Sequence, residues 1–247
     1  PGQATGIIHR TGEAYGQIFG SKNARTTVDG KEYVLIDRST GTTIFLPQSE
    51  IIGDPNPNHI LGFTNTFSYK GLSLRALFEW RQGGDLYSIT SGALQARGQL
   101  KDSEIREPLR VIPGYLGDPS TFEALKDEQG NPIRNTVPIT SFDYTFSNGF
   151  GYYGADETMV YDATVIRLRE LSLSYDLPTK WLDKTPVGSV RLSVSGRNLW
   201  FNAPNMLSGV NLDPEVLAEA ADSNVQGFEF GSTPPTKRWG VNLRVTF

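Results

Sequence analysis

The last eleven residues of the chain alternate between apolar and polar side chains. The apolar positions are Trp239, Val241, Leu243, Val245 and Phe247, and they are separated by Gly240, Asn242, Arg244 and Thr246. Because successive side chains of a strand point to opposite faces, this pattern predicts a strand with one apolar and one polar face. In a soluble sheet the apolar face would be buried. In an outer-membrane barrel it would contact lipid, and the polar face would line the lumen.

The same alternation predicts four further long strands, over residues 61–70, 72–82, 164–177 and 188–200. Lys70-Gly71 suits a two-residue hairpin turn between the first two. In the third, Arg167 and Arg169 fall in the register of Leu171 and Leu173, so the apolar band is expected to end below them. Shorter strands are expected within residues 5–19 and over Glu32–Ile36, and a short helix within 86–100.

The connections between these strands alternate strictly in length. The turn at Lys70-Gly71 is tight, the connection over 83–163 is long, that over 178–187 is short, and that over 201–236 is long. Strands that cross a membrane in an up-and-down barrel have short periplasmic turns and long extracellular loops, which accounts for the rule. In this arrangement the final strand runs inward, with Trp239 near the outer interface and Phe247 at the periplasmic face.

Composition narrows the function classes. The net charge is −4 and charged residues make up 20% of the chain, which gives no electrostatic support for a nucleic-acid partner. Cysteine is absent, which excludes a disulfide framework and thiolate metal sites. No stretch approaches the roughly 20 apolar residues of a membrane helix. The chain begins Pro1-Gly2-Gln3, so we interpret it as a processed or partial chain.

Several short motifs occur in a fixed order along residues 52–247. They are Ile52-Gly53-Asp54-Pro55-Asn56-Pro57-Asn58, Gly62-Phe63-Thr64-Asn65-Thr66-Phe67, Gly83-Gly84-Asp85, the segment from Ile166 to Tyr175 with Leu177-Pro178, Ser195-Gly196-Arg197-Asn198-Leu199, Asp213-Pro214-Glu215 and the closing segment from Gly240 to Phe247. Together they resemble the SusC/RagA family of TonB-linked outer-membrane transporters.

The resemblance implies an all-β fold, an antiparallel up-and-down transmembrane β-barrel with long extracellular loops. The whole protein would be a plugged barrel of about 22 strands, to which residues 1–247 contribute about six C-terminal strands. The plug domain and the N-terminal strands would be absent from this chain. The implied location is the bacterial outer membrane, and the implied partners are membrane lipid, the rest of the barrel and plug, a SusD-like surface lipoprotein, and TonB through an N-terminal segment that this chain does not contain. Transport of oligosaccharides or peptides is implied.

The strand faces assign residues to two environments. The lipid-facing set is Leu72, Leu74, Phe78, Trp80, Leu171, Leu173, Tyr175, Leu192, Val194, Trp239, Val241, Leu243, Val245 and Phe247. The lumen-lining set is Arg75, Glu79, Arg81, Arg191, Arg197 and Arg244. We favour the interpretation that the arginines of the second set pair with acidic neighbours such as Glu79 and Glu170, or with the plug. The alternative is that they line the solute route.

An aromatic run lies in the long connection before residue 164. It comprises Phe142, Tyr144, Phe146, Phe150, Tyr152 and Tyr153. Aromatic faces stack on sugars and anchor partner proteins, so the run is a candidate for substrate or partner contact. The alternative is that these side chains pack the loop onto itself.

No catalytic arrangement is evident, and we expect neither enzymatic activity nor a cofactor nor a metal site. His9 and His59 are the only histidines and are far apart in the sequence. Asp54 and Asn56 offer oxygens to a hard cation, but the ligand spacing of a calcium loop is missing, so a structural turn is favoured.

Two rival hypotheses differ from a transporter. The same barrel could serve as a non-transporting scaffold in an outer-membrane secretion or biogenesis complex. Alternatively, the chain could be a soluble β-sandwich that binds carbohydrate. That fold would require two strand faces to be buried against a second sheet, those of Trp239, Val241 and Leu243 and of Leu171 and Leu173.

Overall fold

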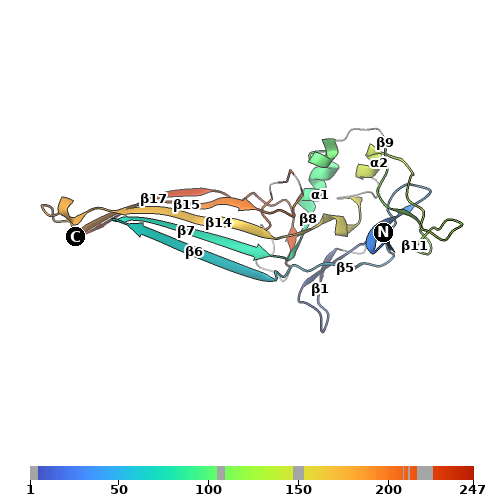
Figure 1. Cartoon of the computed structure of the whole chain (residues 1–247), viewed down its shortest axis with the longest axis horizontal. Coiled ribbons are helices and arrows are strands. Elements are labelled where there is room, and N and C mark those ends of the chain that lie inside the picture. The colour runs from blue at the N-terminus through green and yellow to red at the C-terminus, as the bar shows by residue number, and fades with distance from the viewer. Residues whose placement is uncertain (1–4, 105–108, 147–152, 208, 211, 216–224) are drawn as a thin grey trace.

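The computed structural model of the chain describes residues 5–104, 109–146, 153–207, 209, 210, 212–215 and 225–247. Its shape is elongated, with one long sheet at one end and a lobe of short strands and helices at the other (Figure 1). The C-terminus lies at the free end of the sheet, far from the lobe (Figure 1).

The long sheet consists of five antiparallel strands. They are β6 (His59–Tyr69), β7 (Leu72–Gln82), β14 (Val165–Asp176), β15 (Ser189–Asn202) and β17 (Arg238–Thr246). Their order in the sheet is β17-β15-β14-β7-β6, so each long strand pairs with the long strands that come before and after it in the chain. The predicted all-β, up-and-down arrangement is confirmed. The described residues contain five long strands, where about six were expected.

Short and long connections lie at opposite ends of this sheet, as predicted. Lys70 and Gly71 have φ of 46° and 84°, the left-handed geometry of a tight hairpin turn. A 3-10 turn at Thr179–Trp181 helps to join β14 to β15 at the same end. At the other end, the segments before β6, between β7 and β14, and between β15 and β17 build the lobe (Figure 1).

A bulge in β14 corrects one prediction. The register pairs Leu168 with Phe78 but Glu170 with Leu77, so Arg169 is an extra residue. The bulge reverses the alternation above it, because one added residue moves every following side chain to the other face. Arg167 therefore lies on the polar face opposite Glu79. Leu168 and Ile166 continue the apolar face, which was wrongly expected to end below Arg167.

The lobe is a set of small sheets and short helices. Its strands are β1 (Gly6–Ile8), β2 (Gln17–Gly20), β3 (Arg25–Val28), β4 (Lys31–Asp37), β5 (Glu50–Gly53), β8 (Asp85–Ser88), β9 (Leu109–Arg110), β10 (Tyr115–Asp118), β11 (Glu123–Ala124), β12 (Ile139–Thr140), β13 (Val160–Asp162) and β16 (Phe228–Glu229). Its helices are α1 (Ile89–Ala96) and α2 (Ser141–Phe146), with 3-10 turns at Lys101–Glu104 and Asp156–Met159. The strand expected within residues 5–19 is the pair β1 and β2. No helix in the described ranges could cross a membrane.

Segments far apart in the sequence share one core in the lobe. Ile18 of β2, Tyr87 of β8, Met159 and Phe228 of β16 form a buried cluster. β8 pairs with both β13 and β16, which brings together the two long connections that follow β7 and β15. The three excursions from the sheet therefore fold as one body.

Glu229 is a fully buried carboxylate at the start of α1. One of its oxygens accepts hydrogen bonds from Ser88 Oγ at 2.7 Å and Thr90 N at 3.3 Å, and the other accepts from Thr90 Oγ1 and from Ser232 N at 2.8 Å. The N-terminus of a helix favours a negative charge through its unpaired N–H groups. Burial alone would raise the pKa of Glu229, but these hydrogen bonds outweigh it and hold the pKa below its usual range.

The variant Glu229→Gln tests this cap. The amide keeps the shape but loses the charge, and its NH2 group faces donors, so the free energy of unfolding of the lobe should fall by about 2 kcal/mol at pH 7. A lowered folded-state pKa contributes stability above the unfolded pKa of about 4.3, and this contribution disappears as the pH falls through the folded-state value. We therefore expect the α1 amides of Glu229→Gln to be less protected from hydrogen exchange than those of the unsubstituted protein at pH 7, after correction for intrinsic rates. The two proteins should become equally protected as the pH approaches 3. Equal protection at pH 7 would contradict the role of the charge.

Candidate functional site

The long sheet has one face without a single Asp, Glu, Lys or Arg. The strand register places the following on it: Leu61, Phe63, Phe67 and Tyr69 of β6; Leu72, Leu74, Ala76, Phe78 and Trp80 of β7; Ile166, Leu168, Leu171, Leu173 and Tyr175 of β14; Val190, Leu192, Val194 and Trp200 of β15; and Trp239, Val241, Leu243 and Val245 of β17. We call it the apolar face. Every strand residue predicted to contact lipid lies on it, and Phe247 follows β17.

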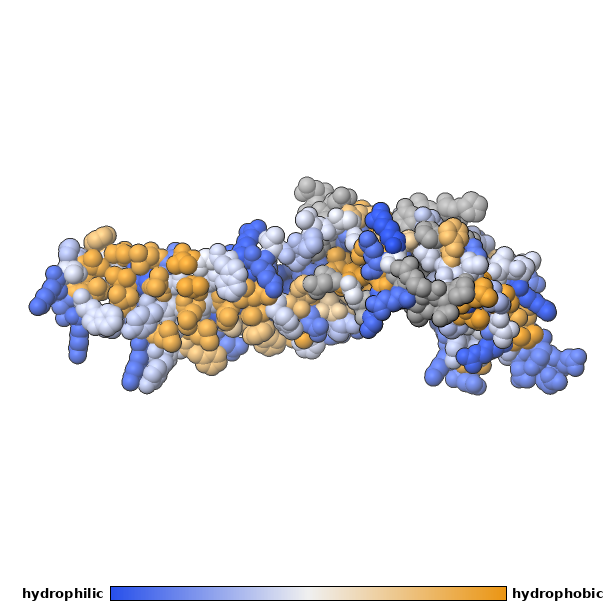
Figure 2. All heavy atoms as spheres, turned by 90° about the horizontal axis from the view of Figure 1, so that it is seen from above, coloured by the Kyte–Doolittle hydropathy of each residue, from blue (hydrophilic) through white to orange (hydrophobic). Residues whose placement is uncertain are grey.

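No described part of the chain covers the apolar face. Val241 is 75% exposed and Leu243 is 63% exposed, and Leu173 of the central strand is also exposed. Figure 2 shows apolar side chains spread along the whole length of the sheet. Exposed apolar patches on soluble monomers rarely exceed a few hundred Å², so this face needs an apolar environment. A β-sandwich would need a second sheet here, and the described residues provide none.

Aromatic residues mark both ends of the apolar face. Tyr69 and Tyr175 lie in one row across the sheet, each paired with Leu72. Trp80 and Trp200 lie near the other end, beside the lobe. The eight-residue step from Leu72 to Trp80 spans about 27 Å of strand at ~3.4 Å per residue. With the usual tilt of 35–45° this corresponds to about 21 Å of membrane thickness, close to the ~25 Å apolar band of outer-membrane barrels.

The opposite face, which we call the polar face, carries the charges of the sheet. Its arginines are Arg75, Arg81, Arg167, Arg169, Arg191, Arg197, Arg238 and Arg244, and its carboxylates are Glu79, Glu170 and Asp176. The polar face therefore has five more positive than negative charges, in a chain whose net charge is −4. All six residues predicted to line the lumen lie on this face.

An ion-pair network lies at the end of the polar face beside the lobe. Arg167 is buried and donates to Glu79 at 2.9 Å and, through Nε, to Asp213 at 3.0 Å. Arg169 in the bulge donates to Glu79 at 2.7 Å and pairs with Glu215. The bulge thus aims two arginines at the same carboxylates. It also fastens Asp213 and Glu215, which belong to the connection between β15 and β17, to the wall formed by β7 and β14.

The sequence did not predict this network. Asp213-Pro214-Glu215 was noted only as a motif of the resemblance, and Arg167 and Arg169 were placed on the wrong face. The only signal in the sequence was the pair of arginines at positions that alternation assigns to the apolar face. A bulge at this point moves them to the polar face.

The other predicted lumen residues have varied partners. Arg197 pairs with Glu170 at 3.4 Å, and Arg191 donates to Asp176 at 2.7 Å across the β14–β15 pair. Arg81 donates to the backbone oxygen of Pro55 at 3.0 Å. Arg75 and Arg244 have no carboxylate partner in the described ranges. Pairing with acidic neighbours therefore accounts for only part of this set.

Two motifs meet where the sheet joins the lobe. Asp54 N donates to Asp85 Oδ2 at 2.7 Å, and Asp85 N donates to Asp54 O at 2.7 Å. Gly84 has φ of 81°, and a Cβ there would lie 2.8 Å from both Pro55 O and an Arg81 nitrogen. Burial raises the pKa of Asp85, and the nearby carboxylates of Asp162 and Asp54 add to it, although the hydrogen bond from Asp54 N opposes the rise.

The predicted aromatic run lies in and after α2. Phe142 is 67% exposed, Tyr153 is also exposed, and the Arg110 guanidinium lies 4.0 Å from the centre of the Tyr144 ring. The side chains of Phe146, Phe150 and Tyr152 are outside the described residues. Contact of this run with a substrate or partner stays a prediction.

The two histidines pack against aromatic rings, and Asp54 forms a hydrogen-bonded turn. His9 packs on Tyr15 and His59 packs edge-on against Trp80, with ring centres 4.6 Å and 5.1 Å apart. Asp54 Oδ1 accepts hydrogen bonds from Asn56 N at 2.9 Å and Asn56 Nδ2 at 2.6 Å. In the described part of the chain, no three His, Cys, Asp or Glu side chains gather in a way that could hold a metal ion.

Comparison with known proteins confirms the resemblance to TonB-dependent receptors of the SusC/RagA type. The chain is 24% identical over 265 residues to TonB-dependent receptor P3 of Formosa agariphila, covering 97% of this chain and 23% of that protein. It is 24% identical over 200 residues to TonB-dependent receptor P26 of the same organism, covering 80% of this chain and 18% of that one. The chain thus spans less than a quarter of the length of these relatives. No family model matches it.

Solved structures share the fold. The RagAB peptide importer in its closed-closed state aligns over 94% of this chain and 23% of the importer chain, with a TM-score of 0.51 and 17% identity. The open-open state aligns over 100% of this chain and 24% of the importer chain, with a TM-score of 0.50 and 17% identity.

The substitution Asp213→Asn tests the ion-pair network. It leaves the buried guanidinium of Arg167 without its main counter-charge, and breaking a buried ion pair on one side typically costs about 3–5 kcal/mol. We expect a clearly lower midpoint of denaturant unfolding for the detergent-solubilised full-length protein. The matched control is Asp176→Asn, whose partner Arg191 is exposed, and it should leave the midpoint nearly unchanged. Equal effects of the two substitutions would contradict the special role of Asp213.

Proposed function

We propose that this chain is the C-terminal portion of the barrel wall of a SusC-like, TonB-dependent transporter in the bacterial outer membrane. The whole protein would import oligosaccharides or peptides together with a SusD-like lipoprotein. The plug domain, the N-terminal strands and the TonB-binding segment would belong to other parts of the protein. We infer no enzymatic role.

The observation that carries the proposal is the charge-free apolar face. Five sequential antiparallel strands present it, and aromatic residues lie towards both of its ends at a spacing close to that of a membrane barrel. Lipid offers no hydrogen-bond partners, so a sheet spans it only when every strand edge is paired. The outer strands β6 and β17 therefore require neighbours from the rest of the protein.

Orientation follows from the connections. In the proposed orientation the lobe is extracellular, the short turns are periplasmic, and Phe247 lies at the periplasmic face. The exposed aromatic residues Phe142 and Tyr153 would then be placed to contact a solute or the lipoprotein partner. The names of the relatives, TonB-dependent receptors and a peptide importer, support energised import.

A non-transporting scaffold remains the second candidate function. The same wall would serve an outer-membrane secretion or biogenesis complex equally well, because the apolar face places the protein in lipid without requiring transport. The discriminating observation is a TonB-binding segment in the full-length protein, since only energised transport needs one.

Membrane integration is tested by fractionating cells that produce the full-length protein. We expect it to stay in the outer-membrane fraction after washing with alkaline carbonate and to need detergent for release, because the apolar face is uncovered. Release into buffer without detergent would contradict the proposal.

A pair of arginine substitutions tests which face contacts lipid. Leu171→Arg places a charge on the apolar face of the central strand. Leu171 is level with Ala76, halfway along the apolar face, where a charge would cost about 2–4 kcal/mol near the middle of the membrane. We expect much less folded, heat-modifiable protein in the outer membrane. The control Ser174→Arg adds the same side chain three positions further along the strand, on the polar face, and should be tolerated. The reverse result would assign the faces the other way round.

A further inference from the structure

We propose that the polar face of β15 and β17 is a binding surface for the anionic groups of an extended solute. It is built on the cross-strand pair Arg197 and Arg238 and on the second pair Arg191 and Arg244. The proposal rests on the proposed function, since it requires the polar face to line the solute route, and it adds the chemical class of the solute.

Like charges face each other directly in both pairs. The register of β15 and β17 places Arg197 opposite Arg238 and Arg191 opposite Arg244. Like charges at directly opposed positions of an antiparallel pair destabilise it. Two carboxylates of β14 lie near, Glu170 at 3.4 Å from Arg197 and Asp176 at 2.7 Å from Arg191. Arg238 and Arg244 have no carboxylate partner in the described part of the chain, so each pair has an excess positive charge.

The residues between the two pairs are short. Ser193 pairs with Asn242, and Ser195 pairs with Gly240. The arginine side chains therefore extend further from the sheet than the small residues between them, and the side chain of Arg197 is 68% exposed. The guanidinium groups are accessible from the space that this face borders, and the hydroxyl and amide groups beneath them can bind the polar groups of a ligand.

This arrangement specifies carboxylate or sulfate groups on an extended molecule. A guanidinium group has a planar fork of donors that matches such anions with two parallel hydrogen bonds. From Arg191 to Arg197 is six residues along β15, or about 20 Å at ~3.4 Å per residue. A ligand that reaches both pairs must therefore be several sugar or amino-acid units long and carry more than one negative charge.

A single introduced cysteine tests the proposal directly. This chain has no cysteine, and any cysteine elsewhere in the full-length protein is first replaced by serine. Ser193→Cys places a thiol between the two arginine pairs in the full-length protein in outer membranes. Its rates of modification by an anionic and a cationic methanethiosulfonate, each divided by the rate with a free thiol, report the local electrostatic potential. We expect the anionic reagent to be favoured by about tenfold, and the ratio to fall as salt is added.

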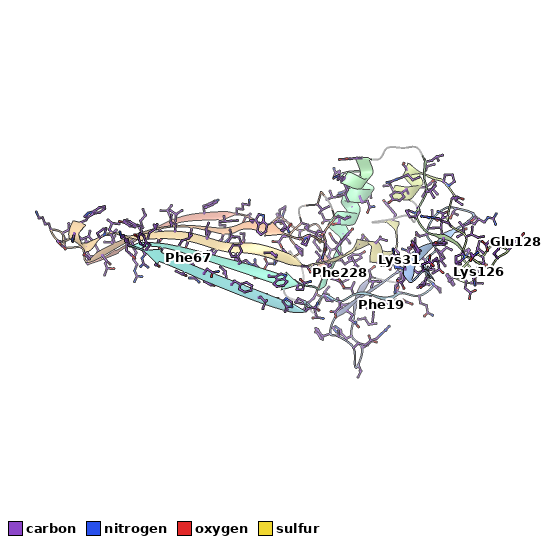
Figure 3. All side chains as sticks on the ribbon, viewed as in Figure 1. Phe19, Lys31, Phe67, Lys126, Glu128 and Phe228 are labelled. Atoms are coloured by element: carbon purple, nitrogen blue, oxygen red, sulfur yellow. The ribbon has the colours of Figure 1, made fainter. Side chains whose placement is uncertain are left out.

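Two further variants, each combined with Ser193→Cys, assign the effect. Arg197→Gln with Arg238→Gln should lower the ratio severalfold, with the remainder coming from the second pair, Arg191 and Arg244. Lys31→Gln with Lys126→Gln removes the same charge from exposed positions in the lobe, far from the sheet, and should leave the ratio unchanged (Figure 3). A galacturonate hexamer or a glutamate hexapeptide should slow modification, and which of them does so identifies the kind of solute. A neutral maltohexaose should not slow it.

Several outcomes would overturn the proposal. An unreactive thiol would mean that protein covers the surface. A ratio near one before the arginines are replaced would mean that carboxylates from the rest of the protein already neutralise them. Protection by neither anionic hexamer would mean that the surface does not bind such solutes. Failure of the proposed function is separate, because it would appear as release of the protein from membranes without detergent.

Discussion

The separation of charge between the two faces of one sheet is the constraint on which the rest of the structure depends. A strand that contacts lipid on one side cannot place an ionised group there without a cost of several kcal/mol. All eleven charged residues of the long strands accordingly lie on the polar face. This requirement must hold along the full length of each strand, and β14 meets it only because its register changes at Arg169. The bulge therefore keeps the apolar face free of charge along the whole of β14.

The same bulge produces the ion-pair network. Because of the bulge both Arg167 and Arg169 reach the polar face, and the strand presents two guanidinium groups to Glu79 and to the Asp213–Glu215 segment. Arg167 is nearly inaccessible to solvent, and its charge is balanced by Glu79 of the sheet and by Asp213, a residue from a connection that lies outside the sheet. The bulge in β14 thus fixes the position of the connection between β15 and β17 through ion pairs to Asp213 and Glu215.

The sequence predicted the parts of this structure that depend on period-two alternation. The five long strands, the hairpin at Lys70-Gly71 and the apolar face follow from that pattern alone. The face predicted for Arg167 was wrong because strict alternation was assumed across the two arginines, where the strand has a bulge. The lobe was not predicted as a unit, because the pairing of β8 with β13 and β16 joins segments that are distant in the chain. The partners of Arg167 and Arg169 were missed for the same reason.

The shared core of the lobe has a consequence for the order of folding. Ile18, Tyr87 and Met159 complete their cluster only with Phe228, which is synthesised more than two hundred residues after Ile18. Contacts between such distant positions form slowly, because a long loop must close before they stabilise anything. The lobe therefore cannot reach its final packing until nearly all of this chain has been made. Premature termination before β16 would leave the cluster of Ile18 and Tyr87 without Phe228, even though both belong to segments completed much earlier.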